Sequence, residues 1–217
     1  MRQLLLDLLP DSPPGLDNFV AGTNAETVAA LTGWLAGATD DPSFCLYGEP
    51  GCGRSHLLQA SGFAYVDAAR DPALKTAGDD ELLAVDNVEA LDETGQIALF
   101  NQFNRLKMAG GRLLTAAGQP PQHLALREDL RTRLGSGLIY RLQPLSDAEK
   151  AEALAAQARD RALKLGPEAI DYLLRHAPRD MRTLSDFVVA LDRYTLEHKR
   201  AVTLPLLREL LTQETSS

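Results

Sequence analysis

The chain has 217 residues, of which 22 are Lys or Arg and 30 are Asp or Glu, so its formal net charge is −8 at pH 7. A protein that coats duplex DNA draws most of its binding free energy from Lys and Arg that displace counterions from phosphates, and the acidic balance therefore argues against strong direct DNA binding. The apolar share of 45% and the charged share of 24% are close to globular averages, which indicates a packed core.

The pattern of the chain excludes other classes. No apolar run approaches the roughly 20 residues that span a bilayer, and the apolar N-terminus contains Asp7 and has no small-residue cleavage site. Two cysteines, Cys45 and Cys52, are too few for a disulfide framework or a zinc site. We therefore expect a cytoplasmic protein without membrane association.

The first predicted elements are a tail and a helix. Residues 1–15 combine an apolar peptide with a proline-rich stretch, and we expect a flexible tail and linker there because proline cannot continue a helix. A helix is predicted from Asn24 to Leu35, where Val28 and Leu31 recur at helical spacing.

Strand-length apolar runs then alternate with helix-like or turn-like segments such as Ile97–Met108. The runs are Phe44–Tyr47, Phe63–Asp67, Leu82–Val85, Arg112–Ala116 and Leu138–Leu142. This alternation is typical of a parallel sheet with helices on both faces. The sequence predicts an α/β domain over residues 16–145, with a P-loop-type sheet of five strands flanked by helices.

The character of the chain changes after Pro144. Helices are predicted at Ser146–Leu165, Pro167–Ala177, Met181–His198 and Thr203–Leu211, with no strand candidate between them. Ser146 is a plausible N-cap, since Glu149 follows three residues later. We expect a small all-helical domain over residues 146–213.

The segment after the first apolar run has the spacing of a Walker A phosphate loop, with arginine in place of the usual lysine. Its residues are Gly48, Glu49, Pro50, Gly51, Cys52, Gly53, Arg54 and Ser55. The glycines let backbone N–H groups turn toward phosphate oxygens, Arg54 supplies a cation near the outer phosphates, and Ser55 offers a hydroxyl to Mg²⁺. Because a guanidinium is longer and forked, we expect binding to survive and hydrolysis to suffer. Cys52 is expected to be exposed enough for oxidation.

A second chemical signal is the apolar run that ends in Asp86. A carboxylate at the carboxyl edge of a strand beside a phosphate loop can hold Mg²⁺ directly or through water. Hydrolases of this architecture carry a second acid next, which orients the attacking water, but here the next residue is Asn87, which cannot accept a proton. The two signals predict nucleotide binding without competent self-hydrolysis.

Further segments resemble the DnaA-related branch of the AAA+ ATPase family. Residues 119–121 (Gln-Pro-Pro) are similar to its Asp-Arg-Pro-Pro turn, residues 129–134 to its Asp-Leu-x-Ser-Arg-Leu segment, and residues 179–184 to the start of its sensor 2 helix. No helix-turn-helix DNA-binding domain is expected after the last helix. With the Gln-Leu-x-Leu-x-Leu peptide of the tail and the Gly-Arg-Ser-His-Leu-Leu phrase of the loop, the chain resembles the Hda group, the regulatory inactivators of DnaA.

The resemblance implies a site for an adenine nucleotide, ADP or ATP, with Mg²⁺ held by Ser55 and Asp86. The implied nucleotide-binding residues are Gly48, Pro50, Gly51, Cys52, Gly53, Arg54, Ser55, His56, Asp86 and Arg182. From the residues alone, the simplest interpretation of His56 is a packing residue on the loop helix. We expect that helix to end near Ser61.

The resemblance also implies two protein partners. Arg133 occupies the place of the family's arginine finger, a guanidinium offered to the nucleotide of a neighbouring subunit, here DnaA carrying ATP. The tail residues Gln3, Leu4, Leu6 and Leu8 are similar to the family's peptide for the DNA polymerase III sliding clamp (its beta subunit). The chain is thus expected to be a regulator of replication initiation that inactivates DnaA, and not an enzyme on its own account.

Two other hypotheses stay open on the sequence. One is an autonomous AAA+ ATPase of the helicase-loader type, against which Arg54 and Asn87 count. The other is an interaction adaptor whose nucleotide site is vestigial. Self-association into a homo-oligomer also stays open.

Overall fold

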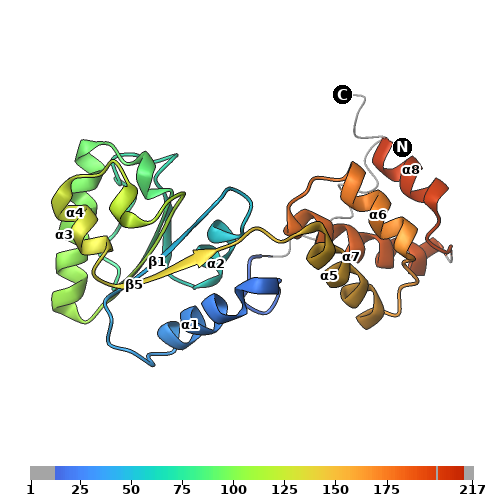
Figure 1. The fold of residues 1–217 in the computed structure, drawn as a ribbon, viewed down its shortest axis with the longest axis horizontal. Coiled ribbons are helices and arrows are strands. Elements are labelled where there is room, and N and C mark those ends of the chain that lie inside the picture. Colours follow the sequence, from blue (N-terminus) through green and yellow to red (C-terminus); the bar gives the residue numbers. More distant parts are fainter. Residues whose placement is uncertain (1–12, 199, 213–217) are drawn as a thin grey trace. The chain divides into compact units, whose positions relative to one another are not determined.

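The computed structural model describes residues 13–198 and 200–212. These residues form two compact units, Pro13–Pro144 and residues 145–212 (Figure 1). Within the described residues, no helix has the length and apolar character needed to cross a membrane.

The first unit is a parallel α/β domain. Its helical elements are η1 (Gly22–Asn24), α1 (Ala25–Leu35), α2 (Arg54–Ala60), η2 (Val88–Ala90), α3 (Glu93–Ala109), η3 (Pro121–His123) and α4 (Glu128–Leu134). Its strands are β1 (Ser43–Gly48), β2 (Ala64–Asp67), β3 (Leu82–Asp86), β4 (Arg112–Ala117) and β5 (Leu138–Leu142). All paired strands are parallel, in the order β2-β3-β4-β1-β5, which confirms the predicted fold class.

Helices cover both faces of this sheet, so the central strands are apolar almost throughout (Figure 1). On one face the strands pack against α1 and α2, and the buried residues there include Leu31, Trp34, Phe44, Leu46, Leu57, Leu58, Ala84, Leu114 and Ala116. On the other face they pack against α3 and α4, and the buried residues include Leu83, Val85, Leu99, Phe103, Leu106, Leu113, Leu130 and Leu134. The strand ends that carry the phosphate loop and Asp86 therefore rest on two separate apolar cores.

The helix boundaries of this unit differ from the predicted ones where a cap decides them. Helix α3 begins at Glu93 and not at Ile97, because the Asp92 side chain accepts a hydrogen bond from the N–H of Gly95 at 2.8 Å and starts the helix earlier. Helix α4 was not among the predicted elements, since its seven residues are too few to show a helical period. Helix α2 ends at Ala60 and is short, as expected.

The second unit is helical, as predicted. It comprises α5 (Asp147–Asp160), α6 (Pro167–His176), α7 (Met181–His198) and α8 (Leu204–Thr212). A reciprocal capping box between Ser146 and Glu149 starts α5. That helix ends before the predicted Leu165, because Ala162 adopts a left-handed conformation with φ of 54°. The core of the unit is built from residues such as Leu154, Ile170, Leu173, Leu184, Phe187, Val188, Leu191 and Leu207.

Asn24 ties the start of α1 to the chain after β5. Its side chain is almost fully buried, donates to the carbonyl of Gln143 at 2.9 Å and accepts from the N–H of Gln143 at 2.7 Å. We predict that Asn24→Ala lowers the free energy of unfolding of this unit by about 1–3 kcal/mol, since the N–H and the carbonyl of Gln143 lose two partly buried hydrogen bonds to a buried side chain. Chemical denaturation measures the loss.

Asn18→Ala is the matched control for this prediction. Asn18 also bonds two backbone groups, the N–H of Gly15 and the carbonyl of Pro13, but these lie in an exposed turn where water can replace the side chain. We expect a loss of about 1 kcal/mol or less. Equal losses for the two variants would contradict the role given to Asn24.

Candidate nucleotide and partner site

The phosphate loop spans the turn from the end of β1 to the start of α2. Gly51 and Gly53 both adopt left-handed conformations, with φ of +81° and +99°. Alternation of right- and left-handed residues is the backbone arrangement from which N–H groups can converge on an anion. The structure thus gives the loop a conformation suited to phosphate, on residues where glycine bears it without strain.

Arg54 is the first residue of α2, and its side chain is only 11% exposed. Its Nη1 atom is buried and makes no hydrogen bond within the described residues. The carboxylate nearest to it is that of Glu89, with 3.9 Å between Nη1 and Oε1. Arg54 is therefore a mostly buried cation at the phosphate loop, and its buried Nη1 atom has no hydrogen-bond acceptor among the described residues.

A segment that the sequence analysis did not assign to the site packs on the loop. The ring of Phe19 lies against Gly53, and its centroid is 5.3 Å from that of His56. The Nε2 atom of His56 lies 2.9 Å from the carbonyl oxygen of Gly15. His56 therefore joins the loop helix to the preceding chain, which is the packing role left open for it.

Asp86, at the carboxyl end of β3, is buried with both carboxylate oxygens in hydrogen bonds. The hydroxyl of Tyr65 donates to Oδ2 at 3.0 Å, and the backbone N–H of Asn87 donates to Oδ1 at 2.9 Å. Burial, with the neighbouring Asp86 carboxylate as a further cause, raises the pKa of Tyr65 to about 12, so its hydroxyl stays protonated at neutral pH. The carboxylate is therefore held in one orientation.

The oxygens of Ser55 and Asp86 fit a magnesium ion by their chemistry, since Mg²⁺ takes oxygen ligands and keeps several waters. Asp86 has lone pairs beyond the two hydrogen bonds it accepts, and Ser55 is exposed at the start of α2. No group of three or more His, Cys, Asp or Glu among the described residues could hold a metal ion. The other ligands would come from nucleotide phosphates and water.

The side chain of Asn87 is engaged in a hydrogen bond and has no acidic group. It adopts a left-handed conformation with φ of 53°, and its side-chain amide donates to Oδ1 of Asp67 at 2.9 Å. Asp67 ends strand β2 and is paired in register with Asp86. The amide is thus bound to the neighbouring strand end.

Cys52 lies differently from the expectation of an exposed, oxidisable thiol. It is 6% exposed, and burial raises the pKa of its thiol above the usual value. Cys45 is a core residue of β1, and burial raises the pKa of its thiol to about 11. Since the thiolate is the reactive form, both positions disfavour thiol chemistry.

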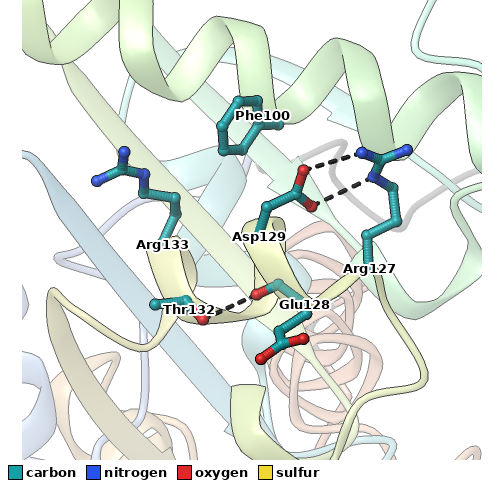
Figure 2. Close-up of a pocket in the computed structure, with 6 residues that line it drawn as sticks. All are labelled: Phe100, Arg127, Glu128, Asp129, Thr132 and Arg133. Carbon is teal, nitrogen blue, oxygen red and sulfur yellow. Dashed lines mark hydrogen bonds and ion pairs between the residues drawn. The ribbon is translucent and has the colours of Figure 1, made fainter.

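Arg133 lies on α4, beside an open hollow of about 800 Å³ (Figure 2). The hollow is lined by Phe100, Arg127, Glu128, Asp129, Thr132 and Arg133. The guanidinium carbon of Arg133 is 5.9 Å from the ring centroids of both Phe100 and Phe103, within the range of cation–π attraction. Among the described residues no carboxylate forms an ion pair with Arg133.

Arg127, the second arginine that lines the hollow, forms an ion pair with Asp129. Arg127 donates to both oxygens of Asp129, from Nε at 3.2 Å and from Nη2 at 2.9 Å, on the other side of Phe100 from Arg133 (Figure 2). The hydrogen bonds from Arg127 hold the pKa of Asp129 below its usual value. Asp129 is therefore an ionised partner of Arg127, which leaves Arg133 as the cation available to a ligand from outside.

Arg182 lies in the first turn of α7 and is exposed. It belongs to the second unit, whereas the phosphate loop belongs to the first, and its part in the nucleotide site stays a prediction. The tail residues Gln3, Leu4, Leu6 and Leu8 lie outside the described residues.

Comparison with solved structures identifies the fold. The chain is similar to domain III of the replication initiation protein DnaA from Thermotoga maritima, with a TM-score of 0.70 and 20% identity over 96% of this chain and 100% of that one. It is similar to AMPPCP-bound DnaA from Aquifex aeolicus, with a TM-score of 0.63 and 24% identity over 88% of this chain and 71% of that one. The RuvB branch migration motor of Thermotoga maritima matches with a TM-score of 0.61 and 18% identity, over 94% and 73% of the two chains. The fold is that of an AAA+ protein.

The second unit gives the narrower assignment. Residues 147–211 of this unit match the family described as the lid domain of Hda. The match and the DnaA-like fold confirm the predicted resemblance to the Hda and DnaA-related AAA+ proteins. They support a DnaA-related role in DNA replication.

Gly51 and Gly53 allow the cost of backbone strain to be measured apart from the cost of a steric clash. Gly51 and Gly53 both have positive φ, but a Cβ atom at Gly51 would meet nothing within 4 Å, whereas one at Gly53 would lie 2.5 Å from the ring of Phe19. We expect Gly51→Ala to cost about 1–2 kcal/mol of unfolding free energy and Gly53→Ala clearly more, because the Phe19 ring must also move. Chemical denaturation of both variants tests this, and equal costs would refute the packing of Phe19 on the loop.

Proposed function

We propose that this chain is a regulator of replication initiation that binds an adenine nucleotide and stimulates ATP hydrolysis by the initiator DnaA. The observation that carries the proposal is Arg133. It has no ion-pair partner among the described residues, and it borders an open hollow in a chain whose residues 147–211 match the Hda lid family. The DnaA-like fold supports the same partner.

The nucleotide site follows from the residues around the phosphate loop. The loop N–H groups and the buried Arg54 guanidinium suit the phosphates, while Ser55 and the oriented Asp86 carboxylate suit Mg²⁺. Ser55 and Asp86 would hold the Mg²⁺, which would supply positive charge that offsets part of the charge of the phosphates. DnaA of the same fold binds the ATP analogue AMPPCP, which supports an adenine nucleotide here, and we propose ADP as the resident form with Arg182 completing the site.

Hydrolysis by the chain itself is proposed to be weak or absent. Asn87 cannot accept a proton from water, and its amide is engaged by Asp67. An isolated AAA+ ATPase of the helicase-loader type would need a general base at this position.

Arg133 is proposed to act on the nucleotide of DnaA. The two phenylalanine rings attract its guanidinium without neutralising its charge. No acceptor among the described residues takes its N–H donors, which can therefore bind phosphate oxygens. A guanidinium beside the γ-phosphate stabilises the charge that develops during phosphoryl transfer and can be worth about 10³–10⁵ in rate. Hydrolysis would convert DnaA to its ADP form and inactivate it.

The tail is proposed to bind the DNA polymerase III sliding clamp. Gln3 offers an amide for backbone hydrogen bonds, and Leu4, Leu6 and Leu8 offer side chains for an apolar pocket. Clamp binding would couple inactivation of DnaA to a clamp already loaded on DNA.

We predict that Arg133→Ala abolishes the stimulation of ATP hydrolysis by DnaA, measured as phosphate release from ATP-bound DnaA in the presence of the clamp on DNA. Arg131→Ala is the control, since Arg131 lies on the same helix and does not line the hollow. It should retain stimulation, and both variants should bind the clamp normally. Stimulation that survives in Arg133→Ala would exclude the trans mechanism.

A separate prediction concerns the tail. Deletion of residues 1–9 should remove binding to the sliding clamp in surface plasmon resonance, because the peptide that contacts the clamp is gone. The deletion should leave the thermal unfolding of the two units unchanged. Unaltered clamp affinity would show that another part of the chain binds the clamp.

A further inference from the structure

Glu89 is a carboxylate at the phosphate loop that the proposed mechanism does not use. It lies in η2, three residues after Asp86, and its side chain is 38% exposed. Its Oε1 atom is 3.9 Å from Nη1 of Arg54 and accepts a hydrogen bond from the N–H of Gly118 at 2.8 Å. Glu89 thus stands between the cation of the loop and the turn that follows β4.

The ion pair between Arg54 and Glu89 leaves a buried donor of Arg54 without a hydrogen bond. A separation of 3.9 Å is an ion pair without a hydrogen bond, and Nη1 of Arg54 is buried without one among the described residues. A buried charged donor gains free energy from an anionic acceptor at hydrogen-bond distance. Phosphate oxygens are such acceptors, and the residue at this place of a phosphate loop reaches the outer phosphates.

An outer phosphate at Arg54 meets two opposing charges. The guanidinium attracts it, while the Glu89 carboxylate, held in place by Gly118, repels it. The distance from Glu89 to Arg54 is short compared with the screening length of about 8 Å at physiological salt, so the repulsion is felt by a phosphate bound to Arg54. The effect grows with each negative charge added at the outer end of the nucleotide.

We propose that Glu89 is the residue that sets the phosphate specificity of this loop, and that its carboxylate makes the loop favour a nucleoside diphosphate over a nucleoside triphosphate. This inference rests on the proposed nucleotide site. Arg54 supplies the attraction that both ligands share, and Glu89 supplies the repulsion that weighs more heavily on the third phosphate.

The test compares the affinities for ADP and for the non-hydrolysable triphosphate AMPPCP, both at saturating Mg²⁺, by displacement of a fluorescent ADP analogue from the full-length protein. The wild type should bind ADP more tightly. Glu89→Gln keeps an oxygen acceptor for the N–H of Gly118 and removes the charge. It should shift the affinity ratio toward the triphosphate by about three- to tenfold, as expected for one partly screened charge.

Two further variants complete the test. Glu26→Gln is the charge-matched control, since Glu26 is an exposed residue of α1, and its affinity ratio should equal that of the wild type. Glu89→Ala removes the charge together with the bond to Gly118 and should shift the ratio in the same direction as Glu89→Gln. A shift in Glu89→Ala alone would assign the effect to the Gly118 turn and overturn the proposal.

The outcomes separate this inference from the function on which it rests. Nucleotide binding with a ratio that Glu89→Gln leaves unchanged overturns the role of Glu89 and leaves the nucleotide site standing. A wild-type protein that binds the triphosphate more tightly than ADP likewise overturns the role of Glu89 and leaves the nucleotide site standing. Failure of the wild type to bind either nucleotide overturns the site and the inference together.

Discussion

The pairing of β1 between β4 and β5 is the constraint on which the rest of the site depends. Both pairings are parallel, so the strand is covered by hydrogen bonds at both edges and by helices on both faces. The chain leaves this strand at the carboxyl edge of the sheet, where β3 and β4 end as well. The loop, Asp86 and the Gly118 turn share one edge for this reason, and that edge is where open parallel sheets bind ligands.

That constraint also explains how much of the molecule could be predicted from the sequence. A strand buried on both faces is a continuous apolar run, and the five runs were visible without any knowledge of their pairing. The phosphate loop was visible because its chemistry is local, with glycines, a cation and a hydroxyl within eight residues. The order of the strands was not predicted, since it depends on which distant runs pair.

The parts that sequence reasoning missed are contacts between distant segments. Tyr65 reaches Asp86 because of the register between β2 and β3, and no local pattern in the sequence reveals that register. Glu89 meets Gly118 across 29 positions, and Phe19 covers Gly53 from a segment before α1. The residue types Tyr, Glu and Phe do not by themselves indicate which distant segment they will contact. The Ser146 cap, in contrast, could be predicted because its partner Glu149 lies three residues away. Arg182 and the tail remain predictions of the resemblance.

The bond between Asn87 and Asp67 bears on how the protein could change. The amide donates to a carboxylate oxygen at 2.9 Å, so an aspartate at position 87 in the same rotamer would set two negative charges against each other. A single substitution that restored an acid here would therefore disturb the end of β2 before it could serve hydrolysis. The Asp67 carboxylate at the end of β2 thus limits which residue can follow Asp86 on β3, so an acid at position 87 calls for coordinated change on two strands.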